Sequence, residues 1–165
     1  MKQFKGRVWK LGDNISTDLL MPAISMYGKV PREEIKGYCL KTTKPEFARE
    51  VKSGDIIIAG KNFGCGSSRP ASRNLMELGV GSVVAESCSA IFFRNSIAMG
   101  FPIIISPGVT DIFNDGETAE VRIETGEVIN ITTGQRVNAE AYSEFLRQII
   151  AYGGMVEMFR QDCSL

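Results

Sequence analysis

The residues of this chain most able to do chemistry gather in one glycine-rich segment, residues 60–70. Within it, Ser67, Ser68 and Arg69 place two hydroxyls and a guanidinium side by side, directly before Pro70. Glycine lets the backbone turn tightly and approach a ligand closely. Proline suits the first turn of a helix, because its φ is fixed and it lacks an N–H. Such a segment at a helix start, where N–H groups are unpaired, favours an anion such as a carboxylate or a phosphate.

The same residue types also suit a purely structural role. Arg69 can hold a carboxylate in a bidentate fork, which lysine cannot reproduce. A serine here loses its proton only where N–H groups, an arginine and exclusion of water stabilise the alkoxide. In the structural alternative, Ser68 or Arg69 caps a helix and the glycines serve the turn. The residue types alone leave both interpretations open.

The absence of histidine restricts the chemistry of this chain. None of its 165 residues is a histidine, so Ser-His-Asp and Cys-His nucleophile systems and most zinc hydrolase sites are excluded. Acid–base chemistry therefore falls to other side chains or to a partner chain. The four cysteines, at positions 39, 65, 88 and 163, form no CxxC pair. That spacing is poor for zinc or for a self-contained iron–sulfur site, and we expect free thiols.

Composition and charge favour a cytoplasmic protein with a sizeable core. Apolar residues make up 44% of the chain, enough for one domain with a core. The 19 basic and 19 acidic residues balance, so no net field attracts nucleic acid or an anionic membrane. No apolar run approaches the roughly 20 residues that cross a bilayer. The first residues also lack the apolar core of a signal peptide.

Strand and helix patterns alternate on both sides of the glycine-rich segment. Periodicity and apolar runs predict strands over residues 4–10, 55–60, 82–85 and 101–105, and a hairpin over 117–132. Helices are expected over 31–34, 44–51, 70–78, 90–99 and 139–152, with one further turn at 155–159, and residues 11–29 read as a loop. This alternation predicts a compact α/β domain. The segment lacks the G-x-G-x-x-G pattern and the lysine position of a P-loop, so it does not indicate a Rossmann fold and does not match a P-loop.

Several motifs resemble the small subunits of the aconitase superfamily. They are Asp-Asn-Ile-Ser-Thr-Asp at 13–18, Gly-Lys-Asn-Phe-Gly-Cys-Gly-Ser-Ser-Arg at 60–69 and Ile-Phe-Phe-Arg-Asn-Ser at 91–96, with shorter matches at 84–87 and 100–102. The likeness covers nearly the whole chain and is closest to the small subunits of the 3-isopropylmalate dehydratase and homoaconitase type. It implies a swivelling β/β/α domain over residues 1–165, with a C-terminal hairpin and helix extension from about residue 110, that closes over a larger subunit.

The resemblance also implies a reaction and a set of roles. The reaction is reversible dehydration and hydration of a hydroxy acid, and the [4Fe–4S] cluster of this family belongs to the large subunit, with none bound by this chain. By position, Ser67 corresponds to the catalytic base that removes a proton beside a carboxylate. Asp18 corresponds to an aspartate that organises the site, although an aspartate here also suits a loop-capping turn. Ser68 and Arg69 correspond to ligands of the substrate carboxylate.

Two departures from the family pattern bear on specificity. The family usually has Glu-His after Ser-Ser-Arg, whereas this chain has Pro-Ala at 70–71. The segment after Pro22 normally sets specificity, and here it matches neither the homoaconitase nor the isopropylmalate pattern. Ile24 and Met26 favour an apolar substrate side group. Lys29 can meet a carboxylate or lie solvated at the surface.

We therefore expect the small subunit of an iron–sulfur hydro-lyase, acting with a large subunit on a small hydroxy acid. Isopropylmalate, in leucine biosynthesis, is the first expected substrate, and 2,3-dimethylmalate or homoaconitate is the alternative. The number of large and small subunits that assemble is left open, and no nucleic-acid or membrane partner is expected. A non-catalytic anion-binding regulatory module is the alternative of a different class. The presence of Ser67 and Arg69 argues against it.

Overall fold

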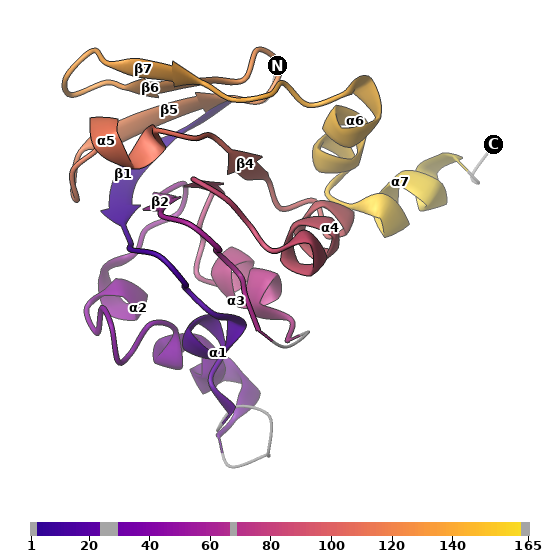
Figure 1. Cartoon of the computed structure of the whole chain (residues 1–165). Coiled ribbons are helices and arrows are strands. Elements are labelled where there is room, and N and C mark those ends of the chain that lie inside the picture. The colour runs from indigo at the N-terminus through magenta and orange to yellow at the C-terminus, as the bar shows by residue number, and fades with distance from the viewer. Residues whose placement is uncertain (1–2, 24–29, 67–68, 163–165) are drawn as a thin grey trace.

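A seven-stranded sheet organises the computed structural model, which describes residues 3–23, 30–66 and 69–162. The strands follow one another across the sheet in the order β4-β3-β2-β1-β5-β6-β7 (Figure 1). Their bounds are β1 Gln3–Lys10, β2 Ile56–Ala59, β3 Ser82–Ala85, β4 Ile103–Ile105, β5 Thr118–Arg122, β6 Glu127–Asn130 and β7 Arg136–Asn138. Strand β1 pairs in parallel with β2 and antiparallel with β5. It therefore joins a parallel half to an antiparallel half.

Helices lie in the connections between the strands and, for α6 and α7, after the last strand. They are α1 Thr17–Leu20, the 3-10 helix η2 Arg32–Tyr38, α2 Phe47–Glu50, α3 Ala71–Glu77, α4 Ala90–Ala98, α5 Val109–Ile112, α6 Glu144–Tyr152 and α7 Met155–Asp162. Helices α1, α2 and α3 lie together at the end opposite β5, β6 and β7 (Figure 1). No helix in the described ranges has both the length and the apolar character needed to cross a membrane.

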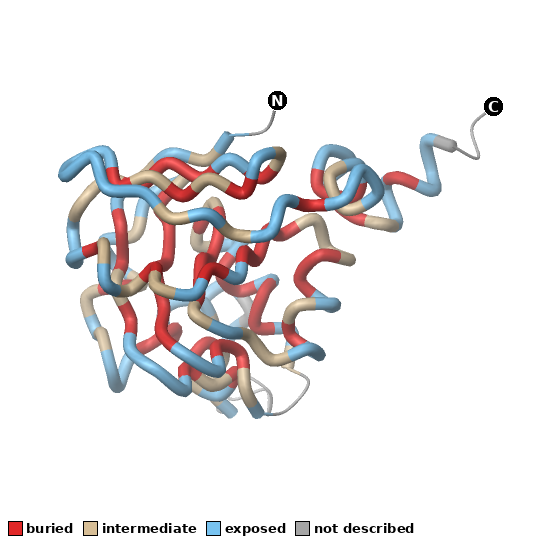
Figure 2. The backbone as a smooth tube through the Cα atoms, turned by 45° about the horizontal axis from the view of Figure 1, so that its top comes forward, coloured by how far each residue is buried: buried red, intermediate tan, exposed pale blue. Residues whose placement is uncertain are grey.

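The parallel half of the sheet is covered on both faces. Every residue of β2 and β3 is buried, as is typical of parallel strands packed on both sides. One core contains Trp9, Ile57 and Val83 and takes in residues of α1, α2 and α3. The other contains Val8 and Ile58 and takes in residues of β5, β6, α5 and α6. Figure 2 shows that exposed residues predominate in α7, at the C-terminal end.

The structure confirms the α/β class, the four predicted strands and the hairpin formed by β5 and β6. The expectation of a loop over 11–29 is wrong in part, because α1 lies within that range. The Ser16 side chain caps this helix by accepting a hydrogen bond from the Leu19 N–H, and the Leu20 side chain is fully buried. A four-residue helix is too short for its apolar period to be recognised in a sequence.

The C-terminal region also differs from the expectation. The helix expected over 139–152 begins only at Glu144, where the Ser143 side chain caps it by accepting a hydrogen bond from the Leu146 N–H. The preceding residues include β7, which pairs antiparallel with β6. Helix α5 was not expected, and α7 is longer than the single turn predicted for 155–159. A local cap at Ser143 and the pairing of the neighbouring strands β6 and β7 contribute to these boundaries.

Candidate active site

The glycine-rich segment lies where the carboxyl ends of β1, β2 and β3 meet. Because these strands are parallel, the segments that follow them leave the same edge of the sheet. Backbone hydrogen bonds hold the segments together, from the Thr17 N–H to the Cys65 carbonyl at 2.8 Å and from the Phe63 N–H to the Ser87 carbonyl at 3.0 Å. Ligands of open α/β sheets bind at this edge. The fold therefore places the segment where a site is expected.

Close packing explains why glycine is needed at two positions here. At Gly64 the backbone has a φ of +72°, and an added Cβ would lie 2.3 Å from the Phe92 ring. At Gly60 an added Cβ would lie 1.9 Å from the Asp13 carboxylate. That carboxylate accepts a hydrogen bond from the Lys61 N–H at 2.7 Å. The glycines therefore permit close approach between neighbouring segments as well as turning of the chain.

The Arg69 side chain joins the glycine-rich segment to α1. Its Nη2 lies 2.7 Å from Oδ1 of Asp18, and its Nη1 donates to the Met21 carbonyl at 2.9 Å. The Arg69 side chain is 19% exposed, whereas that of Asp18 is 56% exposed. A guanidinium has five N–H donors, so these two contacts leave donors available to an anion. The structure thus brings together two of the residues singled out in the sequence.

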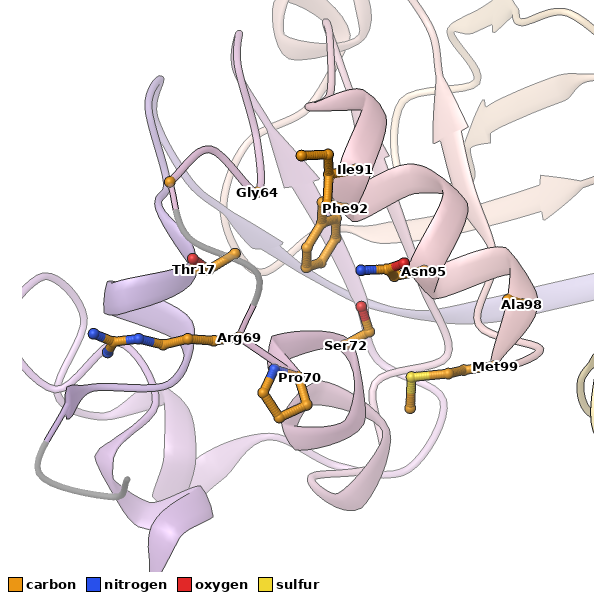
Figure 3. A pocket seen from close by; sticks show the side chains of 11 residues that line it. Thr17, Gly64, Arg69, Pro70, Ser72, Ile91, Phe92, Asn95, Ala98 and Met99 are labelled. Carbon is orange, nitrogen blue, oxygen red and sulfur yellow. The ribbon is translucent and has the colours of Figure 1, made fainter. Parts of the chain in front are cut away.

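The start of helix α3 differs from the predicted anion site at a helix N-terminus. It has seven residues, and its N-cap residue, Pro70, makes no side-chain capping hydrogen bond. The guanidinium of Arg69 is directed toward α1 rather than over the start of α3 (Figure 3). The donors that could meet an anion here therefore belong to the arginine side chain rather than to the start of α3.

Five of the residues singled out in the sequence lie outside the described residues, namely Ile24, Met26, Lys29, Ser67 and Ser68. The structure describes Gly66 and Arg69, the residues on either side of the two serines. The roles of all five stay predictions.

A pocket of about 300 Å³ lies between α4 and the glycine-rich segment (Figure 3). Apolar residues form much of its lining, among them Pro70, Phe92 and Met99. The Asn95 side chain points into it from α4, whereas the Arg69 side chain extends away from the other lining side chains (Figure 3). A pocket of this kind can accept a short hydrocarbon group with one amide contact. Its volume is at the lower end of about 300–1,000 Å³, the usual range for ligand pockets.

The helix that follows the site contributes a residue that sequence reasoning missed. Asn74 of α3 is 3% exposed, and its Nδ2 donates to the Leu20 carbonyl at 2.6 Å. Leu20 is the last residue of α1. The only signal in the sequence is a polar residue between the apolar positions of a short helix. That signal does not identify its partner.

Glu86, in the matched motif at 84–87, has a structural role. Its carboxylate accepts hydrogen bonds from the Gly108 N–H at 2.7 Å, from the Thr110 N–H at 2.9 Å and from the Thr110 hydroxyl at 2.7 Å. Partial burial acts to raise the pKa of Glu86, but these hydrogen bonds and the charge of Lys61 outweigh it and lower the pKa. Glu86 therefore anchors the start of α5 as a carboxylate.

The thiols of the described residues are free, as expected for Cys39, Cys65 and Cys88. Burial raises the pKa of Cys39 to about 12 and that of Cys88 to about 12, so both are protonated at neutral pH. Within the described ranges, no three His, Cys, Asp or Glu side chains are grouped so as to hold a metal ion.

Comparison with known proteins supports the resemblance seen in the sequence. Residues 16–108 match the family described as Aconitase C-terminal domain. An isopropylmalate/citramalate isomerase small subunit from Methanocaldococcus jannaschii is 42% identical, and the alignment covers 97% of this chain and 95% of that protein. A 3-isopropylmalate dehydratase small subunit from Aquifex aeolicus is 43% identical, with 98% of this chain and 97% of that protein covered.

The fold agrees with these relatives. The crystal structure of a 3-isopropylmalate dehydratase from Methanocaldococcus jannaschii superposes with a TM-score of 0.88 at 32% identity. The superposition covers 98% of this chain and 95% of that one. This chain therefore belongs to the aconitase C-terminal domain family, and within it to the group of 3-isopropylmalate dehydratase small subunits.

Proposed function

We propose that this chain is the small subunit of a two-subunit hydro-lyase that interconverts 3-isopropylmalate and 2-isopropylmalate in leucine biosynthesis. The observation that carries this proposal is the match of nearly the whole chain to small subunits named for that dehydratase, at 40% identity or more. The word "subunit" in those names implies a large partner chain. The enzyme is therefore active only as the pair of subunits.

In this proposal, the glycine-rich segment and α1 form the small subunit's part of the active site. Arg69 binds one substrate carboxylate through the donors that Asp18 and Met21 leave available. Asp18 holds the guanidinium in its direction, and Ser68 adds a hydrogen bond to the same carboxylate. The alkoxide of Ser67 takes the proton from the carbon next to that carboxylate in dehydration, and the hydroxyl so formed returns the proton in hydration.

The chemistry divides between the two subunits. Dehydration requires that a proton leave carbon as the hydroxyl leaves its neighbour, and hydration reverses both steps. A [4Fe–4S] cluster on the large subunit supplies, when bound, Lewis-acid assistance to the hydroxyl. The small subunit's residues take and return the proton, hold the carboxylate and exclude water. Serine serves as a base only as the alkoxide, which forms only when it is shielded from water and faced by cationic and N–H groups.

Closure of the whole chain, residues 1–165, as one swivelling domain over the large subunit completes the site in this proposal. Ile24 and Met26 contact the apolar side group of the substrate, and Lys29 is the candidate for a second carboxylate. A methyl side group is the second candidate, because one relative is named for both isopropylmalate and citramalate.

The test is a substrate panel on the enzyme reconstituted from both subunits. We expect kcat/KM to be highest for 3-isopropylmalate, lower for citramalate and 2,3-dimethylmalate, and lowest for the tricarboxylate homocitrate. The isolated small subunit should be inactive. Absence of turnover with every compound, or a preference for homocitrate, would overturn the proposal.

A further inference from the structure

Two consecutive carbonyls at the end of α1 are held by two side chains from one stretch of the chain. The carbonyl of Leu20 accepts a hydrogen bond from Nδ2 of Asn74 at 2.6 Å. The next carbonyl, of Met21, accepts one from Nη1 of Arg69 at 2.9 Å. The last carbonyls of a helix lack partners within the helix. Helix α1 has only four residues, so these side chains supply partners that the helix itself cannot.

The two hydrogen bonds differ in their exposure to water. Asn74 is 3% exposed, and its bond to Leu20 is buried, so water cannot readily replace it. Arg69 is partly exposed, and both of its contacts compete with water. The Asn74 bond is therefore the more rigid link between α1 and α3. It fixes the Leu20–Met21 peptide, which directly precedes the peptide whose carbonyl, that of Met21, accepts the hydrogen bond from the guanidinium.

We propose that Asn74 is a positioning residue for Arg69 and acts on substrate binding through the Leu20–Met21 peptide. It makes no contact with substrate itself. The inference rests on the proposed function, in which Arg69 binds a substrate carboxylate. When Asn74 is lost, α1 shifts on α3, and both the Met21 carbonyl and Asp18 hold the guanidinium in a different direction. The carboxylate then binds less tightly, which raises KM more than it lowers kcat, because the contact is made in both ground and transition states.

The fold contains a matched control for this hydrogen bond. Asn130 is fully buried, and its Nδ2 donates at 2.6 Å to the carbonyl of Ile112. Ile112 is the last residue of α5, which is also a four-residue helix. Asn130 therefore does for α5 what Asn74 does for α1, without a link to Arg69. Asn130 also donates a hydrogen bond to Glu117. Its replacement should therefore lower the free energy of unfolding at least as much as the replacement of Asn74.

The experiment compares Asn74→Leu and Asn130→Leu in the reconstituted two-subunit enzyme. We expect both variants to lower Tm, and only Asn74→Leu to raise KM for 3-isopropylmalate, by about tenfold, the loss expected for one charge-assisted hydrogen bond. In the isolated small subunit, the NMR resonance of the Arg69 Nε–H should move in Asn74→Leu and stay in place in Asn130→Leu. If a leucine variant does not fold, the pair Asn74→Ser and Asn130→Ser gives the same comparison.

A double-mutant cycle shows whether Asn74 acts through Arg69. In an Arg69→Lys background, Asn74→Leu should cause no further rise in KM. An unchanged KM in Asn74→Leu, an equal rise in Asn130→Leu, or a full additional rise in the Arg69→Lys background would each overturn the inference. Turnover by the unmodified enzyme tests the proposed function separately, so the two can fail independently.

Discussion

Asp18 and Arg69 come from segments that follow two different strands, and their side chains meet at 2.7 Å. The carboxylate lies in the first turn of α1, and the guanidinium reaches it from the residue before Pro70. This ion pair sets the direction of the one arginine that the proposed mechanism uses. It also means that a substrate carboxylate at Arg69 must share the guanidinium with Asp18.

Replacement of Arg69 by lysine should weaken substrate binding. Lysine keeps the charge but cannot hold a carboxylate in a bidentate fork while it also contacts Asp18 and the Met21 carbonyl. We expect kcat/KM for 3-isopropylmalate to fall by about 10- to 100-fold, the loss of a charge-assisted hydrogen bond. Steady-state kinetics of the reconstituted enzyme measures this. The matched control is Arg73→Lys on α3, where an exposed arginine pairs with Glu77; an equal loss in that variant would refute a specific role for Arg69.

Removal of the charge of Asp18 shows whether its carboxylate orients the Arg69 guanidinium or competes with the substrate for it. In Asp18→Asn the guanidinium loses its charged partner, and we expect KM to rise by about three- to tenfold, because a fixed direction is lost at a partly exposed pair. Asp111→Asn, an exposed position on α5, is the control for the loss of one negative charge. A lower KM in Asp18→Asn would show instead that the carboxylate competes with the substrate.

Substitutions at two glycines measure the cost of backbone strain and the cost of close packing separately. Gly64 and Gly134 both have positive φ, at +72° and +80°. An added Cβ would collide with Phe92 at Gly64 but meets nothing within 4 Å at Gly134. We expect Gly134→Ala to lower the free energy of unfolding by about 1 kcal/mol. Gly64→Ala should lose a further 1–3 kcal/mol or so from overpacking. Denaturant unfolding of the isolated chain measures both, and equal losses would contradict the packing argument.

Glu86 should contribute a pH-dependent part of the stability. Hydrogen bonds from Gly108 and Thr110 lower its pKa in the folded chain. A lowered pKa means that the carboxylate stabilises the fold above the pKa of the unfolded chain, about 4.3. This stabilisation is lost as the pH falls from about 4.3 through the lower pKa of Glu86 in the folded chain. The difference in unfolding free energy between the unmodified chain and Glu86→Gln should therefore be complete at neutral pH and shrink in acid.

Unfolding titrations at several pH values measure this difference. Glu140→Gln, at an exposed position, controls for the general effect of one carboxylate. A difference between the unmodified chain and Glu86→Gln that stays constant from neutral pH into acid would argue against the predicted anchoring of α5.

The strands of the parallel half could be predicted because their sequences are apolar runs bounded by glycine or proline. The β2 strand, Ile56–Ala59, is buried throughout, and such runs predict strands covered on both faces. Helix α1 could not be predicted, because it depends on the Ser16 cap, on Asn74 and on Arg69. Two of these three partners are distant in the sequence. Short helices held by tertiary hydrogen bonds show no period of their own.

The candidate site was predictable as a set of residues but not as an arrangement. Motifs indicated Asp18 and Arg69, yet their pairing depends on which segments the sheet brings to one edge. Asn74 was missed, because a single buried amide in a helix does not reveal the carbonyl that it binds. The roles of Ser67 and Ser68 stay predictions from the resemblance.

The most direct test of the proposed chemistry is the turnover of Ser67→Ala in the reconstituted enzyme. We predict that dehydration of 3-isopropylmalate falls by about 100-fold or more, the usual contribution of a positioned acid–base group. Association with the large subunit, followed by size-exclusion chromatography, should be unchanged. Ser53→Ala, at an exposed turn, should retain full activity. Near-normal turnover in Ser67→Ala would contradict the central claim that this hydroxyl moves the proton.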